Sequence, residues 1–290
     1  METSALVLCP TFPRFAGDSI GADFVLECVK NLSKENVNLT VVTAGEFSDD
    51  EKKYDAYLDL KYGIKVKRFA HFRPVKFQKL AYFPGGIPAQ LRNSLFAKLQ
   101  LPLFIISYIL CSLKYAKDAK VVHCHWAISL IPGLIIKKLL GKKVAVTIRE
   151  NNPVPIRKSF IFRHLLRRAD AVVANTNHYF SEMLKCGVRK NRFYRILNGV
   201  NPAFRIQSKT RLRKEKKINE DILLITYVGF LIDRKGPIEL FKSYEILQKD
   251  YNNLQLNYIG DGELRDTLEL MSLNSNLSDK VNFTGILKPN

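Results

Sequence analysis

Two adjacent cations at a glycine turn are the residues of this sequence best suited to binding an anion. Arg234 and Lys235 stand directly before Gly236, and a helical pattern starts after that glycine. The first turn of a helix has free backbone N–H groups, and an arginine offers a planar fork to phosphate oxygens. Taken alone, the pair is more typical of a solvated loop. The turn therefore indicates an anion site only together with its surroundings.

A second candidate for close backbone contact is Gly17, which lies between a predicted strand and a predicted helix. A residue without a Cβ lets the main chain approach an anion at a helix N-terminus. Asp18 and Ser19 follow it and have side chains typical of N-caps, so we expect them to cap that helix. The two roles are compatible.

A histidine ends one of the predicted strands. His125 stands at the carboxyl end of residues 120–125, the end that faces the crevice of an open α/β sheet. Its imidazole either hydrogen-bonds a hydroxyl group of a substrate or is a core side chain satisfied by nearby backbone. Side chains alternate along a strand, so His123 shares its face and Cys124 does not. No metal site is predicted from this triplet.

Composition limits the classes of protein to consider. The chain has 290 residues, which is typical of about two domains, and 47% of them are hydrophobic, which excludes a disordered chain. With 46 Lys and Arg against 27 Asp and Glu, the net charge of +19 attracts polyanions, anionic lipid surfaces or phosphorylated substrates. The five scattered cysteines favour a reduced, cytosolic protein. No secretory signal is visible, and the longest apolar run, 99–113, is interrupted by Pro102 and is too short for a membrane span.

Short β-branched runs alternate with helical patterns along the chain. This alternation predicts an α/β fold with doubly wound parallel sheets. A polar, basic stretch separates two series of elements, so we expect an N-terminal domain over 1–204, a connector over 205–221 and a partial second domain over 222–290. The predicted strands cover 5–9, 39–45, 120–125, 143–148, 171–176, 222–229, 254–262 and 281–285. Helices are expected at 24–32, 99–116, 128–140, 238–249 and 264–273.

Five strings in order carry a resemblance to a known family. The sequence resembles the GT-B fold glycosyltransferases of family 4, which move a sugar from a nucleotide-sugar donor with retention of configuration. The strings are FPRFAGDSIGADFVLECVKNL, VVHCHWAISLIPGLIIKKLLGKKVAVTI, ADAVVANTNHYFSEMLKCGV, RILNGVNPAF, and YVGFLIDRKGPIELFKSYEIL followed by YIGDGELRDTLE and VNFTG. The resemblance implies two Rossmann-like domains, an acceptor side in the first, a donor side in the second, and no metal or cofactor beyond the nucleotide-sugar.

The resemblance also implies roles for residues in the second domain. The lysine that matches Lys235 contacts the donor phosphates in the family, and Arg234 is a further candidate for them. The turn formed by Gly260, Asp261 and Gly262 is similar to an element whose backbone lies near the base or the phosphates. Gly17 belongs to the string that resembles the family's first glycine loop.

Two positions depart from the family pattern. Arg149 stands where the family usually has a histidine near the reacting sugar, so Arg149 and His125 are the catalytic candidates. Arg149 either binds a phosphate or carboxylate in the cleft or pairs with an acid such as Glu150. Phe230 stands where the family commonly has an arginine that assists the lysine. One expected phosphate ligand is therefore replaced.

The third departure lies at the end of the sequence. The family's pair of glutamates, seven residues apart, belongs after the last predicted strand, and the sequence ends at Asn290 before reaching it. We therefore expect a C-terminally truncated member with an incomplete second domain, whose own activity is open.

Residues 64–88 interleave basic and aromatic side chains. Either the cations bind anionic lipid head groups while rings enter the membrane interface, or the segment is a strand and loop whose rings pack inward while the charges face water. The first interpretation predicts that this cytoplasmic protein contacts the inner face of the cell membrane. With the resemblance, we expect a polysaccharide or glycolipid as acceptor. For the hydrophobic helix from Leu99 we expect burial in the core. The cations are Lys65, Lys67, Arg68, Arg73, Lys76 and Lys79, and the rings are Phe69, Phe72, Phe77, Tyr82 and Phe83.

Two other classes of function remain as alternatives. Arg149, Phe230 and the missing tail favour a non-catalytic binding protein of GT-B shape. A nucleic-acid-binding protein is the third class, because basic and aromatic tracts suit backbone contacts and base stacking. The sequence carries no signature of a common nucleic-acid-binding module, so no nucleic acid is expected as a partner.

Overall fold

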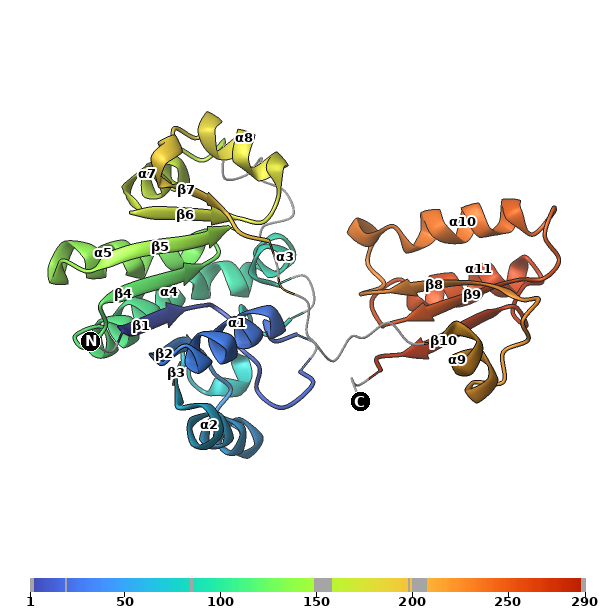
Figure 1. Ribbon diagram of the computed structural model, residues 1–290, viewed down its shortest axis with the longest axis horizontal. Helices are drawn as coiled ribbons and strands as arrows, with labels where there is room; N and C mark the ends of the chain where they lie inside the picture. The colour runs from blue at the N-terminus through green and yellow to red at the C-terminus, as the bar shows by residue number, and fades with distance from the viewer. Residues whose placement is uncertain are drawn as a thin grey trace. The chain divides into compact units, whose positions relative to one another are not determined.

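A computed structural model describes residues 3–18, 20–83, 86–148, 158–197, 199 and 208–287. The chain forms two compact units, residues 1–201 and residues 202–290. Each unit is built on a parallel sheet, as the alternation of strands and helices predicts (Figure 1).

The first unit contains a seven-stranded sheet in the order β3-β2-β1-β4-β5-β6-β7. Its strands are β1 (Thr3–Leu8), β2 (Val37–Ala44), β3 (Ile64–Phe69), β4 (Val121–His125), β5 (Lys143–Ile148), β6 (Ala171–Ala174) and β7 (Phe193–Arg195). Of the two edge strands, β7 is absent from the strands predicted from the sequence, and β3 lies in the segment 64–88, for which a strand and loop was one of two alternatives. β3 has Lys or Arg at three of its six positions. An edge strand tolerates them because it does not need to be apolar on both faces.

Helices cover both faces of this sheet. They are α1 (Asp23–Lys34), α2 (Asp49–Tyr62), α3 (Gly86–Asn93), α4 (Leu95–Tyr115), α5 (Leu130–Leu140), α7 (Phe160–Arg168) and α8 (Asn177–Lys185), with short 3-10 turns η1 (Val75–Phe77), η2 (Ala127–Ser129) and η3 (Lys190–Arg192). Side-chain alternation divides the core. Leu6 and Leu8 of β1 pack with residues of α4 and α5, while Val7 packs with residues of α1 and α2. Gly141 ends α5 as its C-cap, with φ +65°.

Helix α4 differs from its prediction in length and in burial. It runs for 21 residues because Ser94 caps it, accepting a hydrogen bond from Ala97 N at 3.1 Å. Pro102 removes one helical hydrogen bond but does not end the helix. The expectation of burial in the core is wrong for one whole face: Leu99, for example, is 67% exposed. Within the described residues, α4 is the one helix whose length and apolar composition match a membrane span.

The second unit has a three-stranded sheet in the order β10-β9-β8. Its elements are α9 (Lys209–Glu215), β8 (Leu223–Val228), η4 (Asp233–Lys235), α10 (Pro237–Leu247), β9 (Leu254–Ile259), α11 (Arg265–Asn274) and β10 (Val281–Gly285). Phe241 and Tyr244 of α10 fill the core against Leu256 and Tyr258 of β9. Helix α9 lies within the stretch expected as a connector. That stretch, residues 205–221, belongs to the second unit.

Candidate functional site

Three glycines line the carboxyl edge of the small sheet. Gly229 follows β8, Gly260 follows β9, and Gly285 ends β10. The N–H of Gly229 donates to Ile259 O at 3.0 Å, and the N–H of Gly260 donates to Gly285 O at 2.9 Å. A Cβ on Gly260 would stand 1.9 Å from Gly229 O, a distance that no side chain allows. The three strand ends therefore form a bare backbone surface.

The Gly260-Asp261-Gly262 turn is held against the loop that follows β8. Leu231 N donates to Asp261 O at 3.0 Å, and Leu264 N donates to Leu231 O at 3.0 Å. A Cβ on Gly262 would lie 2.5 Å from Leu231 O. The two glycines of this turn thus serve close packing between neighbouring loops, and the loop that carries Arg234 and Lys235 is anchored to this turn.

Lys235 and Arg234 are exposed at the start of α10. They form η4, and Gly236 follows with φ +67° as the N-cap of the helix. Within the described part of the chain, neither side chain makes a hydrogen bond or an ion pair. No side chain caps α10, so its first turn offers backbone N–H groups near these cations. Glu239 is also in this first turn, and it brings one negative charge to the same helix end.

Arg265 is a cation of this edge that the sequence analysis missed. It begins α11, three residues after Gly262, so a cation at the start of the helix after the glycine turn was the available signal. A Cβ on Gly285 would lie 3.6 Å from Arg265 Nη1, so the guanidinium stands over the end of β10. Its Nε contacts Glu269 Oε1 at 2.8 Å, and its Nη1 lies 3.8 Å from Asp261 Oδ2. Asp261 Oδ1 accepts from the N–H of Gly262 at 2.8 Å, so this carboxylate is engaged within its own turn.

In the first unit, Asp18 does not have the role predicted for it, and the anion contact of Gly17 stays a prediction. Helix α1 begins at Asp23 after Ala22, and no side chain caps it, so capping by Asp18 is wrong. Asp18 instead accepts from Arg14 Nε at 2.7 Å and is 1% exposed. Burial favours a higher pKa for Asp18, but the hydrogen bonds and charge of Arg14 outweigh it and lower the pKa. Gly17 has φ +79°, and a Cβ there would have no atom within 4 Å. Ser19 lies outside the described residues.

A buried arginine fixes the loops at the carboxyl ends of β1, β2 and β3. Arg68 is 4% exposed and contacts Asp55 Oδ2 at 2.8 Å and Glu51 Oε1 at 3.3 Å. It also donates to Tyr82 OH at 3.0 Å and to Pro13 O at 2.7 Å. For Arg68, the alternative of binding lipid head groups is therefore wrong, because Asp55 and Glu51 on α2 hold its guanidinium inside the unit. The rings of Phe69 and Tyr82 are buried with it.

His125 lies in the core at the end of β4. Its side chain is 0% exposed, and its ring centroid is 4.3 Å from that of His123, which confirms that the two share a face. His123 Nε2 is 2.8 Å from Thr147 Oγ1. Trp126 follows with φ +63°, and its N–H donates to Thr147 O at 3.1 Å. A catalytic role for His125 stays a prediction, and Arg149 lies outside the described residues. In the described ranges, no group of three or more His, Cys, Asp or Glu is arranged to hold a metal ion.

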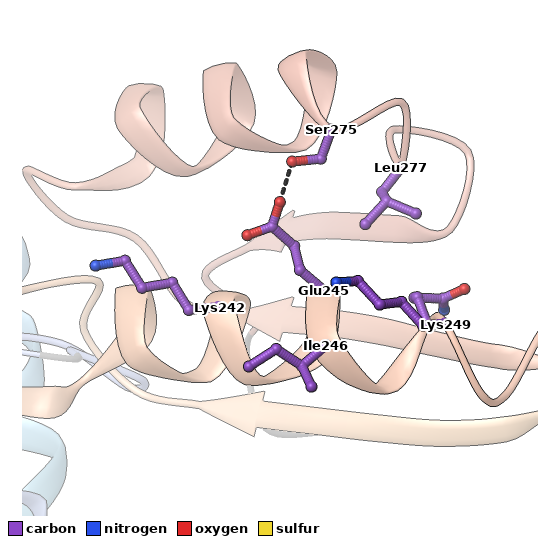
Figure 2. A pocket seen from close by; sticks show the side chains of 7 residues that line it. Lys242, Glu245, Ile246, Lys249, Ser275 and Leu277 are labelled. Atoms are coloured by element: carbon purple, nitrogen blue, oxygen red, sulfur yellow. Dashed lines mark hydrogen bonds between the residues drawn. The ribbon is translucent and has the colours of Figure 1, made fainter.

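A shallow hollow of about 600 Å³ lies between α10 and α11, apart from the predicted site residues (Figure 2). Glu245 accepts a hydrogen bond from Ser275 across it. The residues that line it are Lys242, Glu245, Ile246, Gln248, Lys249, Ser275 and Leu277. They start two turns after Lys235, and most belong to the far end of α10.

Family models match almost the whole chain. The model described as Glycosyltransferase Family 4 matches residues 22–204, and the model described as Glycosyl transferases group 1 matches residues 208–290. The chain belongs to glycosyltransferase family 4. The resemblance seen in the sequence strings is thereby confirmed.

Solved structures show the fold of this family 4 chain. Anabaena Alr3699/HepE in complex with UDP and glucose is similar with a TM-score of 0.67 at 15% identity, covering 99% of this chain and 70% of that one. The sucrose-phosphate synthase of Thermosynechococcus elongatus has a TM-score of 0.70 at 16% identity, covering 99% of this chain and 71% of that one. Likenesses at this identity establish the α/β GT-B architecture, as predicted.

One curated relative of the family 4 chain is an uncharacterized glycosyltransferase of Methanocaldococcus jannaschii. It is 21% identical over 176 residues, which is 56% of this chain and 43% of the relative. The match therefore spans less than half of that protein.

Phe230 stands at the position where the resemblance implies a second phosphate-binding cation. Its carbonyl accepts a hydrogen bond from Tyr227 OH at 2.9 Å.

Proposed function

We propose that this family 4 chain binds a nucleotide-sugar at the carboxyl edge of its small sheet and transfers the sugar, with retention, to a polysaccharide or glycolipid acceptor. The observation that carries the proposal is the exposed Lys235, unpaired among the described residues, beside Arg234 at the uncapped start of α10. The bare glycine edge next to it leaves room for a ligand close to the main chain.

The chemistry of the transfer explains why such an edge is needed. When the glycosidic bond to the donor loosens, negative charge grows on the leaving diphosphate, and fixed cations and backbone N–H groups stabilise it. Lys235 and Arg234 supply the cations, and the first turn of α10 supplies the N–H groups. The UDP-glucose complex of Anabaena HepE supports a nucleoside diphosphate sugar as the donor.

The acceptor side belongs to the first unit in this proposal. Retention without a protein nucleophile fits a reaction on one face of the sugar, in which the leaving diphosphate takes the proton of the acceptor hydroxyl. Arg149 and His125 are the candidates for holding the reacting groups. The family assignment and the strand-end position of His125 support this part of the proposal.

Titration of the full chain with UDP-glucose, other nucleotide-sugars and UDP tests the donor site. Lys235→Ala is expected to weaken binding by about tenfold or more, because a charge-assisted contact to phosphate is lost. Lys242→Ala is the matched control, since it removes the same exposed charge two turns along the same helix. Equal affinity of Lys235→Ala and wild type, or no binding of any nucleotide-sugar, would overturn the proposal.

Phe230 supports one alternative function, that of a non-catalytic nucleotide-sugar-binding protein. An apolar ring stands there in place of the phosphate-binding arginine that the family commonly has. Measurement of sugar release from a bound donor separates the two functions. Release that depends on an added acceptor supports the transferase. Tight binding without release supports the non-catalytic protein.

A further inference from the structure

An apolar stripe on α4 faces away from the core of the first unit. Its large side chains are between 42% and 72% exposed: Leu95, Phe96, Leu99, Leu103, Ile106 and Leu110. At 3.6 residues per turn these six positions fall within an arc of about 100° and extend for about 22 Å along the helix. Soluble proteins rarely leave a continuous apolar patch of this kind uncovered.

The opposite face of α4 is firmly bound to the same unit. Phe104 meets Phe69 edge-on and Tyr108 stacks on it, with ring centroids 5.3 and 5.0 Å apart, respectively. Tyr108 OH lies 2.9 Å from Ser129 Oγ. Helix α4 packs beside α5 on one face of the sheet (Figure 1). The helix therefore stays packed on its own unit, and only the apolar stripe is left to meet a partner.

The surroundings of the stripe are basic. Between Asp59 and Asp118 the sequence has no acidic residue and eleven Lys or Arg. Lys98 and Lys114 lie on α4 at the two margins of the stripe, and both are exposed. A second copy of the chain would bring these like charges together, whereas an anionic surface would neutralise them.

A basic loop is fastened beside the first half of the stripe. Gln100, which is 1% exposed, accepts from Lys79 N at 2.9 Å and donates to Phe77 O at 2.8 Å. Phe72 meets Phe96 of the stripe, with ring centroids 5.4 Å apart. These contacts place the exposed Arg73 and Lys76 next to exposed rings, and Phe77 itself is 45% exposed. Exposed cations beside apolar side chains suit the head-group region of a bilayer.

We propose that the α4 stripe docks in the plane of an anionic lipid bilayer, with its leucines in the acyl boundary and the flanking cations at the lipid phosphates. The helix lies on the membrane and does not cross it, because its other face stays packed on the sheet. Lipid binding is measured without any donor, so this proposal stands apart from the proposed sugar transfer.

Vesicle flotation of the full chain tests the proposal. Wild type is expected to float with vesicles of phosphatidylcholine and phosphatidylglycerol, less with phosphatidylcholine alone, and less as salt rises. Leu99→Glu with Ile106→Glu is expected to lower the partition coefficient by at least about tenfold, because two apolar side chains leave the acyl boundary. The matched control is Leu60→Glu with Leu270→Glu, which adds the same two charges at exposed leucines of α2 and α11. Equal binding by the α4 variant and the control would overturn the proposal.

A second readout does not depend on a destabilising charge. Ile106→Trp is expected to shift its emission to the blue and to be quenched by brominated lipids, whereas Leu60→Trp is not. Absence of quenching at position 106 would contradict docking by this face. Light scattering tests whether a second copy of the chain covers the stripe instead. If wild type is a dimer and Leu99→Glu with Ile106→Glu converts it to a monomer, the stripe belongs to a second copy and membrane docking is overturned.

Discussion

Gly260 and Gly229 meet so closely that a Cβ on Gly260 would stand 1.9 Å from the carbonyl oxygen of Gly229. The contact joins the ends of β8 and β9, and the N–H of Gly260 extends it to Gly285 at the end of β10. Three strand ends are thus held together by main chain alone. The donor site proposed above lies beside this junction.

Gly260→Ala is expected to destabilise the second unit by about 2–4 kcal/mol, because the backbone at the junction has to move. Gly17→Ala is the control: φ at Gly17 is +79°, but nothing surrounds it, so we expect a cost of about 1 kcal/mol. Chemical unfolding measures the two losses, and hydrogen exchange locates them. Equal losses would show that only the backbone angle matters at Gly260.

Arg68→Leu is expected to destabilise the first unit by about 3–5 kcal/mol, because Glu51 and Asp55 lose the cation that compensates their burial. Arg73→Leu removes an exposed arginine close by in the chain and is expected to have little effect. Thermal unfolding of both variants measures the difference. A small effect of Arg68→Leu would mean that the two carboxylates find other partners.

Asp18→Asn is expected to remove an acid-sensitive part of the stability. Burial raises the pKa of Asp18 and Arg14 lowers it, and the net effect holds the folded pKa below 3.8. The pair therefore stabilises the fold above the unfolded pKa, and this contribution disappears as the pH falls through the folded pKa. The gap in unfolding free energy between wild type and Asp18→Asn should close as the pH falls below 3.8 and through the lowered folded pKa of Asp18. Asp59→Asn, at an exposed carboxylate, serves as the control.

His71 is expected to make stability depend on pH in a higher range. Burial lowers its pKa from 6.5 to about 4, against the opposing effect of a hydrogen bond with Gln100. Between these values the unfolded chain binds the proton and the folded chain does not, so stability falls as the pH drops, by up to about 3 kcal/mol. His71→Phe should flatten urea unfolding free energies across this window. His164→Phe, which replaces an exposed imidazole, serves as the control.

Arg265→Gln tests the cation that stands over Gly285, and this prediction rests on the proposed donor site. Nucleotide-sugar affinity is expected to fall by about tenfold through loss of a charged hydrogen bond. Arg211→Gln is matched to it, since Arg211 also pairs with a glutamate four residues on, in the same unit. If calorimetry shows equal affinities for both variants while melting temperatures stay unchanged, Arg265 does not contact the donor.

The inner strands could be predicted from the sequence, because a strand buried on both faces must be apolar throughout. Only five of the ten described α-helices were predicted from it. The edge strand β3 could not, since its alternating Lys and Val are equally compatible with a loop or a surface strand. The same limit applies to Asp18. Its side chain is a good N-cap, yet in the fold Arg14 lies near enough to hold it, and α1 begins only at Asp23.

By itself the sequence determined the alternating α/β plan, the division into two series of elements and the glycine turns around Lys235, since these depend on local patterns of apolar residues and glycines. Only the tertiary structure decided that Arg68 is buried, that Arg265 joins the glycine edge, and that the leucines of α4 face outward. The hydrophobicity and charge of a side chain determine which environment it favours. Which partner it contacts depends on residues that are distant along the chain and become neighbours only in the fold.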